Sequence, residues 1–225
     1  MAEPTAGMDY SFCWGILSIA SLLYKGFNVD RLSLRKNILQ TRDRIPAAHR
    51  KQMSTTIHNL LLPHLSICKA GHIFIYVHFR SEVQTMDLIK QLLQKGCTVS
   101  VPLTLAKQST LLPISIDNPE EQLIPGYYGI PEPTPAAVAA STGRCADIDT
   151  VIVPGSVFDA RGGRLGYGGG FYDRFLSRDA PQAKRVALAY EAQMIASVPV
   201  EPHDQCMDHV ITEKQIYNCQ RSCHA

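Results

Sequence analysis

The 225-residue chain lacks several features that would place it in a specialised class of protein. No run of Lys and Arg exceeds two residues, and 22 basic against 20 acidic residues leave a net charge of only +2. A dedicated nucleic-acid-binding domain usually carries a basic stripe, so no nucleic-acid partner is expected. The chain also has no internal repeat and no low-complexity segment. These absences favour an ordinary globular protein with one sizeable core.

The chain also lacks an apolar run long enough to span a membrane. The apolar stretch at residues 12–24 falls short of the roughly 20 residues that a spanning helix needs. Glu3 and Asp9 precede it and Lys25 follows it, which is unlike a secretory signal. No arginine occurs before Arg31, which is unlike a mitochondrial presequence. We therefore expect a cytoplasmic protein with an N-terminal extension and no stable membrane insertion; a short membrane-associating helix is the alternative.

No CxxC pair occurs among the seven cysteines. They are Cys13, Cys68, Cys97, Cys145, Cys206, Cys219 and Cys223. An odd number of scattered cysteines is typical of a cytosolic protein, so we predict reduced thiols. Cys219, Cys223 and His224 form an alternative metal-ligand set in the tail, although the sequence offers no second ligand pair.

Glycine is concentrated in one stretch of the chain. Seven of the 15 glycines fall between Gly155 and Gly170. Residues 149–153 before this stretch are typical of a buried strand, and residues 171–177 after it of the start of a helix. Glycine lets backbone N–H groups turn toward an anion, and a helix N-terminus adds partial positive charge. The pattern predicts a phosphate-binding loop; the alternative is that the glycines serve only as turn residues.

Charged residues near this glycine loop strengthen the phosphate interpretation. Arg164 and Arg174 flank the loop, and Asp159 and Asp173 are candidate metal ligands. Two further arginines, Arg31 and Arg35, lie four apart in an amphipathic basic segment at residues 30–44 and therefore share one helix face. Such charges usually form a solvent-exposed helix face. Two arginines on one face could also bind a small polyanion.

Alternating strand and helix patterns predict an α/β fold with a mainly parallel central sheet. Helices are expected at residues 30–44, 46–62 (ended by Pro63) and 85–94, and strands at 71–79, 97–102, 111–116, 149–153, 185–190 and 210–212. The strand–helix–strand order from residue 71 to 102 implies a parallel pair with a right-handed crossover. The strand at 111–116 is expected to be antiparallel.

Polar residues follow several of the predicted strands. Glu82 comes after the strand at 71–79, the glycine loop follows that at 149–153, and Gln193 follows that at 185–190. Ligands of parallel sheets bind beyond the carboxyl ends of the strands. We therefore predict that Glu82 and the glycine loop belong to one site.

Several sequence blocks occur in a fixed order across residues 31–213. They are Leu34-Arg35, Glu82, Ile130-Pro131-Glu132-Pro133, Pro154-Gly155, Phe158-Asp159, Gly162, Arg164-Leu165-Gly166, Gly168, Gly170, Tyr172-Asp173, Gln193, Val198-Pro199-Val200 and Asp204. Together they resemble the 5-formyltetrahydrofolate cyclo-ligase (methenyltetrahydrofolate synthetase) family. The resemblance implies a three-layer sandwich of the sugar-phosphate isomerase/CoA transferase-like type, with helices on both faces of the sheet. It divides the chain into an extension at 1–30, a ligase domain at 31–213 and a tail at 214–225.

The resemblance also implies an activity. Members convert 5-formyltetrahydrofolate to 5,10-methenyltetrahydrofolate in an ATP- and Mg²⁺-dependent reaction that releases ADP and phosphate. The formyl oxygen attacks the γ-phosphate to give an iminium phosphate, and N10 of the folate then closes the ring. The implied partners are ATP and a folate, possibly polyglutamylated, and a monomer is expected. The alternatives are a non-catalytic nucleotide- or folate-binding paralogue, and an enzyme of different chemistry on a similar sheet.

Site residues are carried over from the family motif position by position. The implied ATP-binding residues are Arg31, Arg35, Arg164, Leu165, Gly166, Tyr167, Gly168, Gly169, Gly170, Phe171 and Tyr172. The implied substrate-binding residues are Val77, Glu82, Tyr128, Tyr167, Gly168, Gly169, Gly170 and Phe171. Arg164 and Glu82 are the expected catalytic residues, Asp173 and Asp204 the expected Mg²⁺ ligands, and Asp159 is expected to be structural.

Four residues depart from the family pattern. Arg31 stands where lysine is common, and Phe171 where tyrosine is more usual. Some members have basic residues inside the glycine loop, where this chain has Tyr167 and Gly169. We therefore expect the phosphate contacts to fall more on backbone amides and Arg164, with weaker nucleotide affinity.

Overall fold

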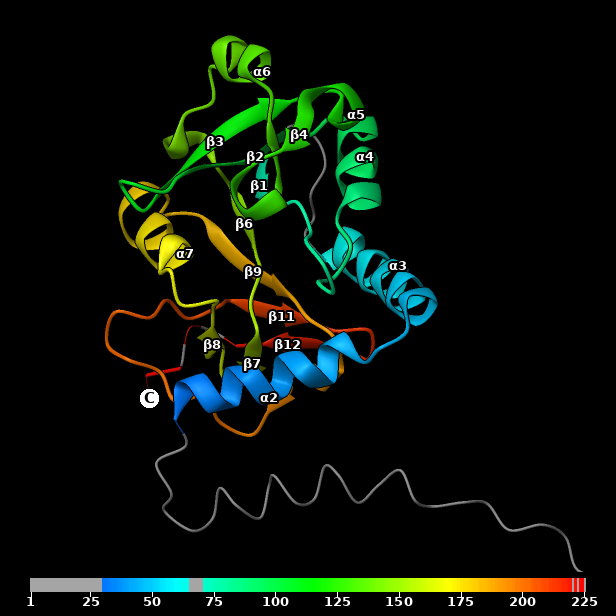
Figure 1. The fold of residues 1–225 in the computed structure, drawn as a ribbon, viewed down its shortest axis with the longest axis vertical. Coiled ribbons are helices and arrows are strands. Elements are labelled where there is room, and N and C mark those ends of the chain that lie inside the picture. The colour runs from blue at the N-terminus through cyan, green and yellow to red at the C-terminus, as the bar shows by residue number, and fades with distance from the viewer. Residues whose placement is uncertain (1–29, 65–70, 220, 222, 225) are drawn as a thin grey trace, which may run out of the picture.

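The computed structural model describes residues 30–64, 71–219, 221, 223 and 224 (Figure 1). The apolar stretch at residues 12–24 lies outside these residues, as do Cys13 and Cys68. The interpretations of the N-terminal extension and of these two cysteines therefore stay predictions.

A seven-stranded sheet forms the centre of the described structure, in the order β12-β11-β9-β6-β1-β2-β3. The strands are β1 (His72–Ile75), β2 (Thr98–Leu105), β3 (Thr110–Ile116), β6 (Thr150–Val153), β9 (Lys184–Leu188), β11 (His209–Ile211) and β12 (Ile216–Asn218). All neighbours from β11 to β2 pair in parallel, whereas β3 and β12 are antiparallel at the two edges. The predicted α/β fold with a mainly parallel sheet is confirmed, including the antiparallel strand at 110–116.

Helices cover both faces of this sheet, which confirms the three-layer arrangement (Figure 1). Successive side chains of a strand point to opposite faces, so Ile73 and Ile75 pack on one side and Phe74 on the other. On the first face lie α3 (Ala47–His64) and α4 (Met86–Gln94), which contribute five core residues: Ile57, Leu61, Leu88, Ile89 and Leu92. On the second face lie α7 (Phe171–Arg174) and the π-helix η3 (Phe175–Asp179). The central strands β1 and β6 are buried along their whole length, which explains their largely apolar sequences.

Several predicted boundaries were wrong: β2 runs on to Leu105, β9 already ends at Leu188, and two further cases have an evident cause. Helix α3 continues through Pro63 to His64, because a proline in the last turn removes only one terminal hydrogen bond. Strand β1 ends at Ile75, not at residue 79. Beyond it the Tyr76 carbonyl accepts from Thr85 Oγ1 at 2.8 Å, and the His78 amide donates to the same Oγ1 at 3.0 Å. A side chain thus satisfies backbone groups that a longer strand would have paired.

A small second sheet, in the order β10-β7-β8, holds the glycine loop and was not predicted. Its strands are β7 (Val157–Asp159), β8 (Arg164–Leu165) and β10 (Met194–Ile195). Helix α2 (Arg31–Asp43) lies against it. Asp30 is the N-cap of this helix, and its carboxylate accepts from the amides of Leu32 and Ser33. Leu34 and Ile38 of α2 share an apolar cluster with this sheet. The packing brings the basic helix beside the glycine loop.

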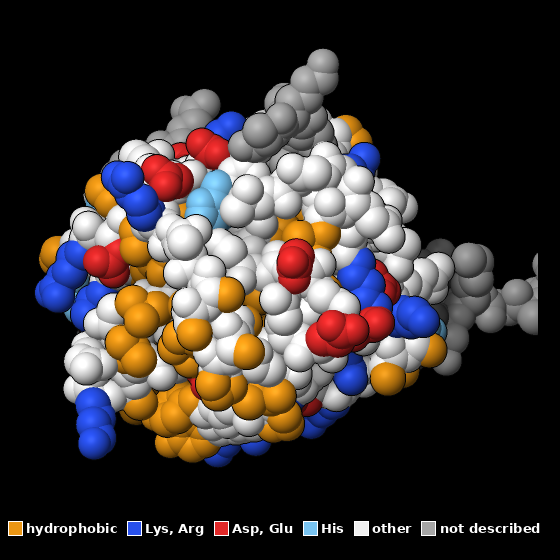
Figure 2. All heavy atoms as spheres, turned by 90° about the horizontal axis from the view of Figure 1, so that it is seen from above, with side chains coloured by type: hydrophobic (Ala, Val, Ile, Leu, Met, Phe, Trp, Pro, Cys, Tyr) orange, Lys and Arg blue, Asp and Glu red, His pale blue; other side chains and the backbone are white. Residues whose placement is uncertain are grey.

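The remaining elements are short and lie around the main sheet. They are α5 (Pro119–Gln122), β4 (Leu123–Pro125), η1 (Tyr127–Gly129), β5 (Pro131–Pro133), α6 (Pro135–Ala140), η2 (Cys145–Asp147) and η4 (Glu191–Gln193). No helix in the described part of the chain is both long and apolar enough to cross a bilayer. Figure 2 looks onto the α6 end of the molecule and shows acidic and basic side chains interspersed with groups of hydrophobic ones.

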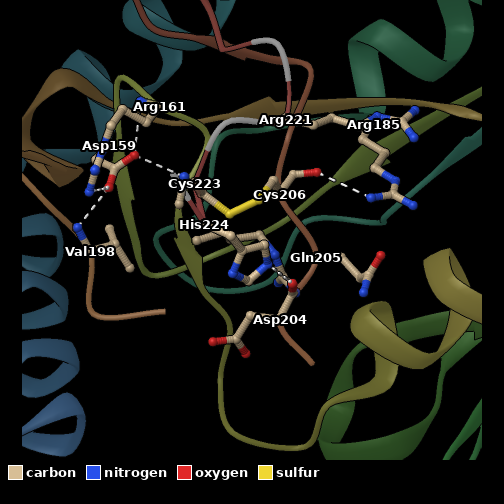
Figure 3. The surroundings of a disulfide bond; sticks show 12 residues. Asp159, Arg161, Arg185, Val198, Asp204, Gln205, Cys206, Arg221, Cys223 and His224 are labelled. Atoms are coloured by element: carbon tan, nitrogen blue, oxygen red, sulfur yellow. Dashed lines mark hydrogen bonds and ion pairs between the residues drawn. A yellow bond between two sulfur atoms is a disulfide. The ribbon is translucent and has the colours of Figure 1, made fainter. Parts of the chain in front are cut away.

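Cys206 and Cys223 form a disulfide, so the prediction that all cysteines are reduced was wrong (Figure 3). The two Cα atoms lie 5.7 Å apart because β12 pairs with β11 and returns the tail to the sheet. Disulfide connectivity depends on the fold and cannot be read from spacing. The pairing also overturns the alternative metal set of Cys219, Cys223 and His224, since the Cys223 sulfur is not a free thiolate.

Candidate active site

A cavity of about 320 Å³ opens between α2, the glycine loop and the segment at residues 201–204. It is lined by Arg31, Arg35, Arg164, Gly166, Gly168, Gly169, Gly170, Phe171, Tyr172, Asp173, Glu201, His203 and Asp204. All of these except Glu201 and His203 are residues that the family resemblance implied. The structure therefore brings together, around one cavity, residues that are up to 173 positions apart in the sequence.

The glycine loop takes backbone conformations that favour glycine. Gly168 has φ +102° and Gly170 has φ +64°, and a Cβ atom at Gly168 would meet nothing within 4 Å. The loop is open to a ligand at this point and is tied to α2 by Arg35, whose Nε donates to the Gly166 carbonyl at 2.8 Å. Arg35 thus holds the loop while its side chain also lines the cavity.

Arg164 and Asp173 form a buried ion pair at the base of the cavity. Arg164 Nη2 lies 2.7 Å from Asp173 Oδ1, and Arg164 Nη1 donates to the Pro154 carbonyl at 3.1 Å. Burial acts to raise the pKa of Asp173, but the Arg164 guanidinium and the Gln205 amide hold that pKa below its ordinary value. Asp173 is therefore an ionised carboxylate at neutral pH.

A second ion pair joins α2 to the loop that follows β10. Arg31 Nη2 lies 2.9 Å from Asp204 Oδ2, and Arg31 Nη1 lies 2.8 Å from Glu201 Oε1. The backbone amide of Glu201 donates to the same Asp204 oxygen at 2.7 Å. Both aspartates expected to bind metal thus line the cavity, and each is paired with an arginine that was expected to bind phosphate.

Tyr172 places a buried hydroxyl at the cavity. Its ring centroid lies 6.4 Å from that of Phe74 in the core. Within the described residues its Oη has no hydrogen-bond partner. Burial raises the pKa of Tyr172, so its hydroxyl is neutral and able to donate.

Glu82 meets the glycine loop, as the common sheet edge predicted. Tyr167 Oη donates to Glu82 Oε1 at 2.5 Å, and the Phe79 amide donates to Glu82 Oε2 at 2.8 Å. Burial raises the pKa of Glu82, whereas the Tyr167 hydroxyl, the Phe79 amide and the charge of Arg42 each lower it. Gln193 lies nearby and donates from Nε2 to the Gly155 carbonyl at 3.0 Å.

Five residues of the implied site do not line the cavity: Glu82 and Tyr167, which contact each other, and Val77, Leu165 and Tyr128. Val77 is 3% exposed and packs in the main core, and Leu165 is fully buried against α2. Tyr128 is 79% exposed and packs edge-on against Tyr127, with ring centroids 4.5 Å apart. Its turn still lies near the Glu82 loop, because a Cβ atom at Gly129 would sit 3.9 Å from the ring of Phe79.

Besides Glu201 and His203 at the cavity, the structure adds a third residue that was not predicted for the site. Arg42 is 4% exposed, and its Nη1 donates to Tyr167 Oη at 2.8 Å. The sequence carried a signal for it, because Leu34, Ile38 and position 42 follow a helical period and the third position should be apolar. Asp159, in contrast, is fully buried and accepts from three backbone amides, as a structural residue should: those of Arg161, Gly163 and Val198.

The comparisons with known proteins agree on one family. Residues 28–213 match the model of the 5-formyltetrahydrofolate cyclo-ligase family. The 5-formyltetrahydrofolate cyclo-ligase of Mycolicibacterium smegmatis is 30% identical over 193 residues, which cover 83% of this chain and 95% of that protein. The mitochondrial 5-formyltetrahydrofolate cyclo-ligase of Arabidopsis thaliana is 30% identical over 212 residues, covering 84% of this chain and 75% of that protein.

Structural similarity points the same way. The NMR structure of Aquifex aeolicus 5,10-methenyltetrahydrofolate synthetase matches with a TM-score of 0.72 and 28% sequence identity. The match covers 84% of this chain and 93% of that one. It therefore extends over both the main sheet and the elements that surround the cavity.

Proposed function

Because this chain belongs to the 5-formyltetrahydrofolate cyclo-ligase family, and is thus an ATP-dependent ligase of folate metabolism, we propose that its cavity binds the ATP phosphates beside the folate. The observation that carries this proposal is the position of the glycine loop. The loop lines the cavity with its glycines and contacts Glu82 through Tyr167. One loop therefore touches both proposed substrates.

The cavity suits the phosphate groups of a nucleoside triphosphate. Arg31, Arg35 and Arg164 supply positive charge at its wall, and the positive φ angles at Gly168 and Gly170 shape an open loop of backbone amides. We assign the ATP to the set that the family motif implies: Arg31, Arg35, Arg164, Leu165, Gly166, Tyr167, Gly168, Gly169, Gly170, Phe171 and Tyr172. Leu165, whose side chain is buried, would contribute only backbone.

The folate is assigned to the neighbouring region around Glu82. The proposed set is Val77, Glu82, Tyr128, Tyr167, Gly168, Gly169, Gly170 and Phe171. A carboxylate suits the donor edge of a pterin ring because it accepts two hydrogen bonds side by side. Val77, buried in the core, would act by supporting the pocket from behind.

The reaction makes modest demands on protein side chains. The formyl oxygen attacks the γ-phosphorus, the bond to ADP breaks, and the resulting iminium phosphate is attacked by N10 before phosphate leaves. Such a transfer needs positioning and charge neutralisation more than a protein nucleophile. We propose that Arg164 stabilises the negative charge that develops on the transferred phosphate. The Tyr172 hydroxyl, which has no partner among the described residues, is placed to donate a hydrogen bond to an oxygen of a bound substrate.

The residues at the cavity fit a magnesium ion. Asp173 and Asp204 supply the carboxylate oxygens that Mg²⁺ prefers, and both line the cavity. When bound, the ion would supply further neutralisation of phosphate charge. Each aspartate is now paired with an arginine, so we infer that these pairs hold the carboxylates in place and adjust when metal and phosphate enter.

A spectroscopic assay tests the proposal. Purified protein given 5-formyltetrahydrofolate, ATP and Mg²⁺ should form the methenyl product, which is detected by its absorbance. No product should form when ATP is omitted. Folded protein that binds nucleotide without turnover would instead be a non-catalytic paralogue. Conversion without ATP would indicate a different chemistry. A cytoplasmic monomer is our expectation from the sequence, although the Arabidopsis relative is named as mitochondrial.

A further inference from the structure

Arg42 occupies a position of helix α2 where the sequence pattern calls for an apolar side chain. Leu34, Ile38 and Arg42 are spaced four apart and are the three buried residues of this helix. The first two pack into the apolar cluster against β7 and β8. A buried charge is costly unless it is paired and hydrogen-bonded, so the partners of Arg42 indicate why it is there.

Those partners come from three other segments, and one of them is the Gly155 carbonyl, which accepts from Arg42 Nη1 at 3.4 Å. Arg42 Nε donates to Ser81 Oγ at 3.0 Å, and Arg42 Nη1 donates to Tyr167 Oη at 2.8 Å. The guanidinium also lies 5.8 Å from the centre of the Tyr167 ring. Ser81 in turn donates to the carboxylate of Asp43. Arg42 therefore joins α2 to the loop that carries Glu82 and to the glycine loop.

The hydrogen bonds have one direction. A neutral tyrosine hydroxyl has a single proton to donate. Tyr167 Oη accepts from Arg42, and its own proton has two acceptors in range: Glu82 Oε1 at 2.5 Å and the Gly155 carbonyl at 3.4 Å. The shorter distance directs the proton to Glu82. The contacts form a relay from Arg42 through Tyr167 to Glu82, which fixes one carboxylate oxygen while the Phe79 amide fixes the other.

We propose that Arg42, acting through Tyr167, supplies from α2 the positive charge that the glycine loop lacks, and so positions Glu82 for the folate. The inference rests on the proposed function, in which Glu82 binds the folate. Some members of the family carry basic residues in the loop where this chain has Tyr167 and Gly169. Here the cation reaches the same place from a helix 125 positions away in the sequence. Arg42 is thus a positioning residue.

Arg42 also acts on the ionisation of Glu82. The titratable groups whose charges or hydrogen bonds reach Glu82 are Arg42, Tyr76, Tyr167 and Tyr172, and Tyr190 Oη donates to its backbone carbonyl. In this set Arg42 carries the positive charge, and it lowers the pKa of Glu82 against the effect of burial. Its removal should raise that pKa, so the acidic limb of kcat/KM for the folate should move to higher pH.

The first test compares Arg42→Leu with Arg44→Leu, a matched control at the exposed end of the same helix. A hydrogen bond to a charged group contributes about 1.5–3 kcal/mol, equivalent to a roughly 10- to 150-fold change. Arg42→Leu should raise KM and Kd for 5-formyltetrahydrofolate by about that factor, with KM for ATP changed less than about threefold. Arg44→Leu should change neither. An unchanged folate KM and pH profile in an active Arg42→Leu enzyme would overturn the inference.

Two further variants separate positioning from folding. Tyr167→Phe keeps the ring and removes the relay, so it should reproduce the folate defect, and Arg42→Leu/Tyr167→Phe should be no worse than either single variant. Arg42→Leu/Tyr167→Arg returns a guanidinium to the loop and should restore the folate KM to within about threefold. Additive defects, or no rescue in a folded double variant, would contradict the relay.

The relay and the proposed function can fail separately. If wild-type protein shows no turnover, the proposed function fails, and equilibrium dialysis still measures Kd for 5-formyltetrahydrofolate in the same variants. A Kd unchanged by Arg42→Leu and Tyr167→Phe would then reject the relay as well. A Kd raised by both would retain it as a folate-binding device.

Discussion

Asp159 and Asp173 come from the same glycine-rich stretch but have different surroundings. Asp159 is fully buried and accepts from three backbone amides, with Arg161 Nη2 3.9 Å from its Oδ2, whereas Asp173 faces the cavity and pairs with Arg164. The sequence suggested this division through the family motif. The structure supplies the physical reason, because a carboxylate saturated by amides has no lone pair directed at a ligand.

Asp173→Asn should impair turnover far more than folate binding. The substitution keeps the shape of the side chain but removes the charge that faces Arg164 and, by our proposal, the metal. We expect kcat to fall by at least about 100-fold, within the range that electrostatic stabilisation accounts for in other active sites. Steady-state kinetics should show a folate KM within about threefold of wild type. A kcat near wild type would argue against Asp173 as a ligand or charge partner.

Asp159→Asn should instead destabilise the fold. Its Oδ2 accepts from the Val198 amide at 2.7 Å, and an asparagine that keeps the other two bonds would place an NH₂ group against that N–H (Figure 3). A buried donor left unsatisfied costs about 1–3 kcal/mol. Urea unfolding should show that the free energy of unfolding falls by this amount. Asp117→Asn, at an exposed position, should leave the free energy of unfolding unchanged. The folded fraction should keep its KM values.

At the scale of elements, the disulfide ties the end of the chain to the segment that carries Asp204. Cys206 lies two residues after Asp204, and His224, next to Cys223, has its Nε2 3.0 Å from the Asp204 carbonyl oxygen (Figure 3). The described end of the chain therefore packs against the loop that lines the cavity. The family match ends at residue 213, so Cys223 and His224 lie beyond it, whereas their partners Cys206 and Asp204 lie within it.

Cys223→Ser should lower the free energy of unfolding by about 2–4 kcal/mol, since the bond closes a loop between residues 17 positions apart. Urea unfolding under non-reducing conditions should show the difference. A reducing agent should bring wild type to the level of the variant, and Cys145→Ser, a half-buried control outside the bond, should behave as wild type. Equal stability of wild type and Cys223→Ser without reductant would contradict the disulfide.

For the whole molecule, three buried or half-buried histidines make stability depend on pH. Burial lowers the pKa of His58, His72 and His78 below the ordinary value of 6.5. His78 Nδ1 also accepts from the Thr85 amide at 3.2 Å, which requires the neutral ring. The unfolded chain therefore binds protons more readily than the folded one below about pH 6.5, and stability falls as pH falls.

Urea unfolding should show that the free energy of unfolding is about 1–3 kcal/mol lower at pH 5.5 than at pH 7.5. His78→Asn should reduce this loss, because its Oδ1 can accept from Thr85 without titrating. His203→Gln, at a position 72% exposed, should leave it unchanged. A stability that is flat or rises over this interval would contradict the assignment of neutral histidines.

Local patterns were sufficient for six of the seven strands of the main sheet, whereas β12 was not predicted. The near-continuous apolar run at residues 71–79 predicted a strand buried on both faces, and the strand–helix–strand order predicted parallel pairing. The convergence of Glu82 with the glycine loop also followed from local order, since carboxyl ends of parallel strands share one edge of a sheet. Strand β1 shows the limit of this reasoning, because the Thr85 side chain ends it earlier than its composition suggests.

The glycine loop itself, its arginines and its aspartates were thus determined by the sequence, because their residue types and spacing already specify a flexible, charged, anion-binding segment. Which partner each charged group meets was decided only by tertiary structure. The small sheet places α2 beside the loop, and this brings Arg31 to Asp204 and Arg42 to Tyr167. Such pairs form between segments more than 100 positions apart in the sequence. A local sequence pattern does not say which distant segment will lie beside it in the fold. The disulfide between Cys206 and Cys223 arises in the same way, from a tail strand whose pairing depends on the finished sheet.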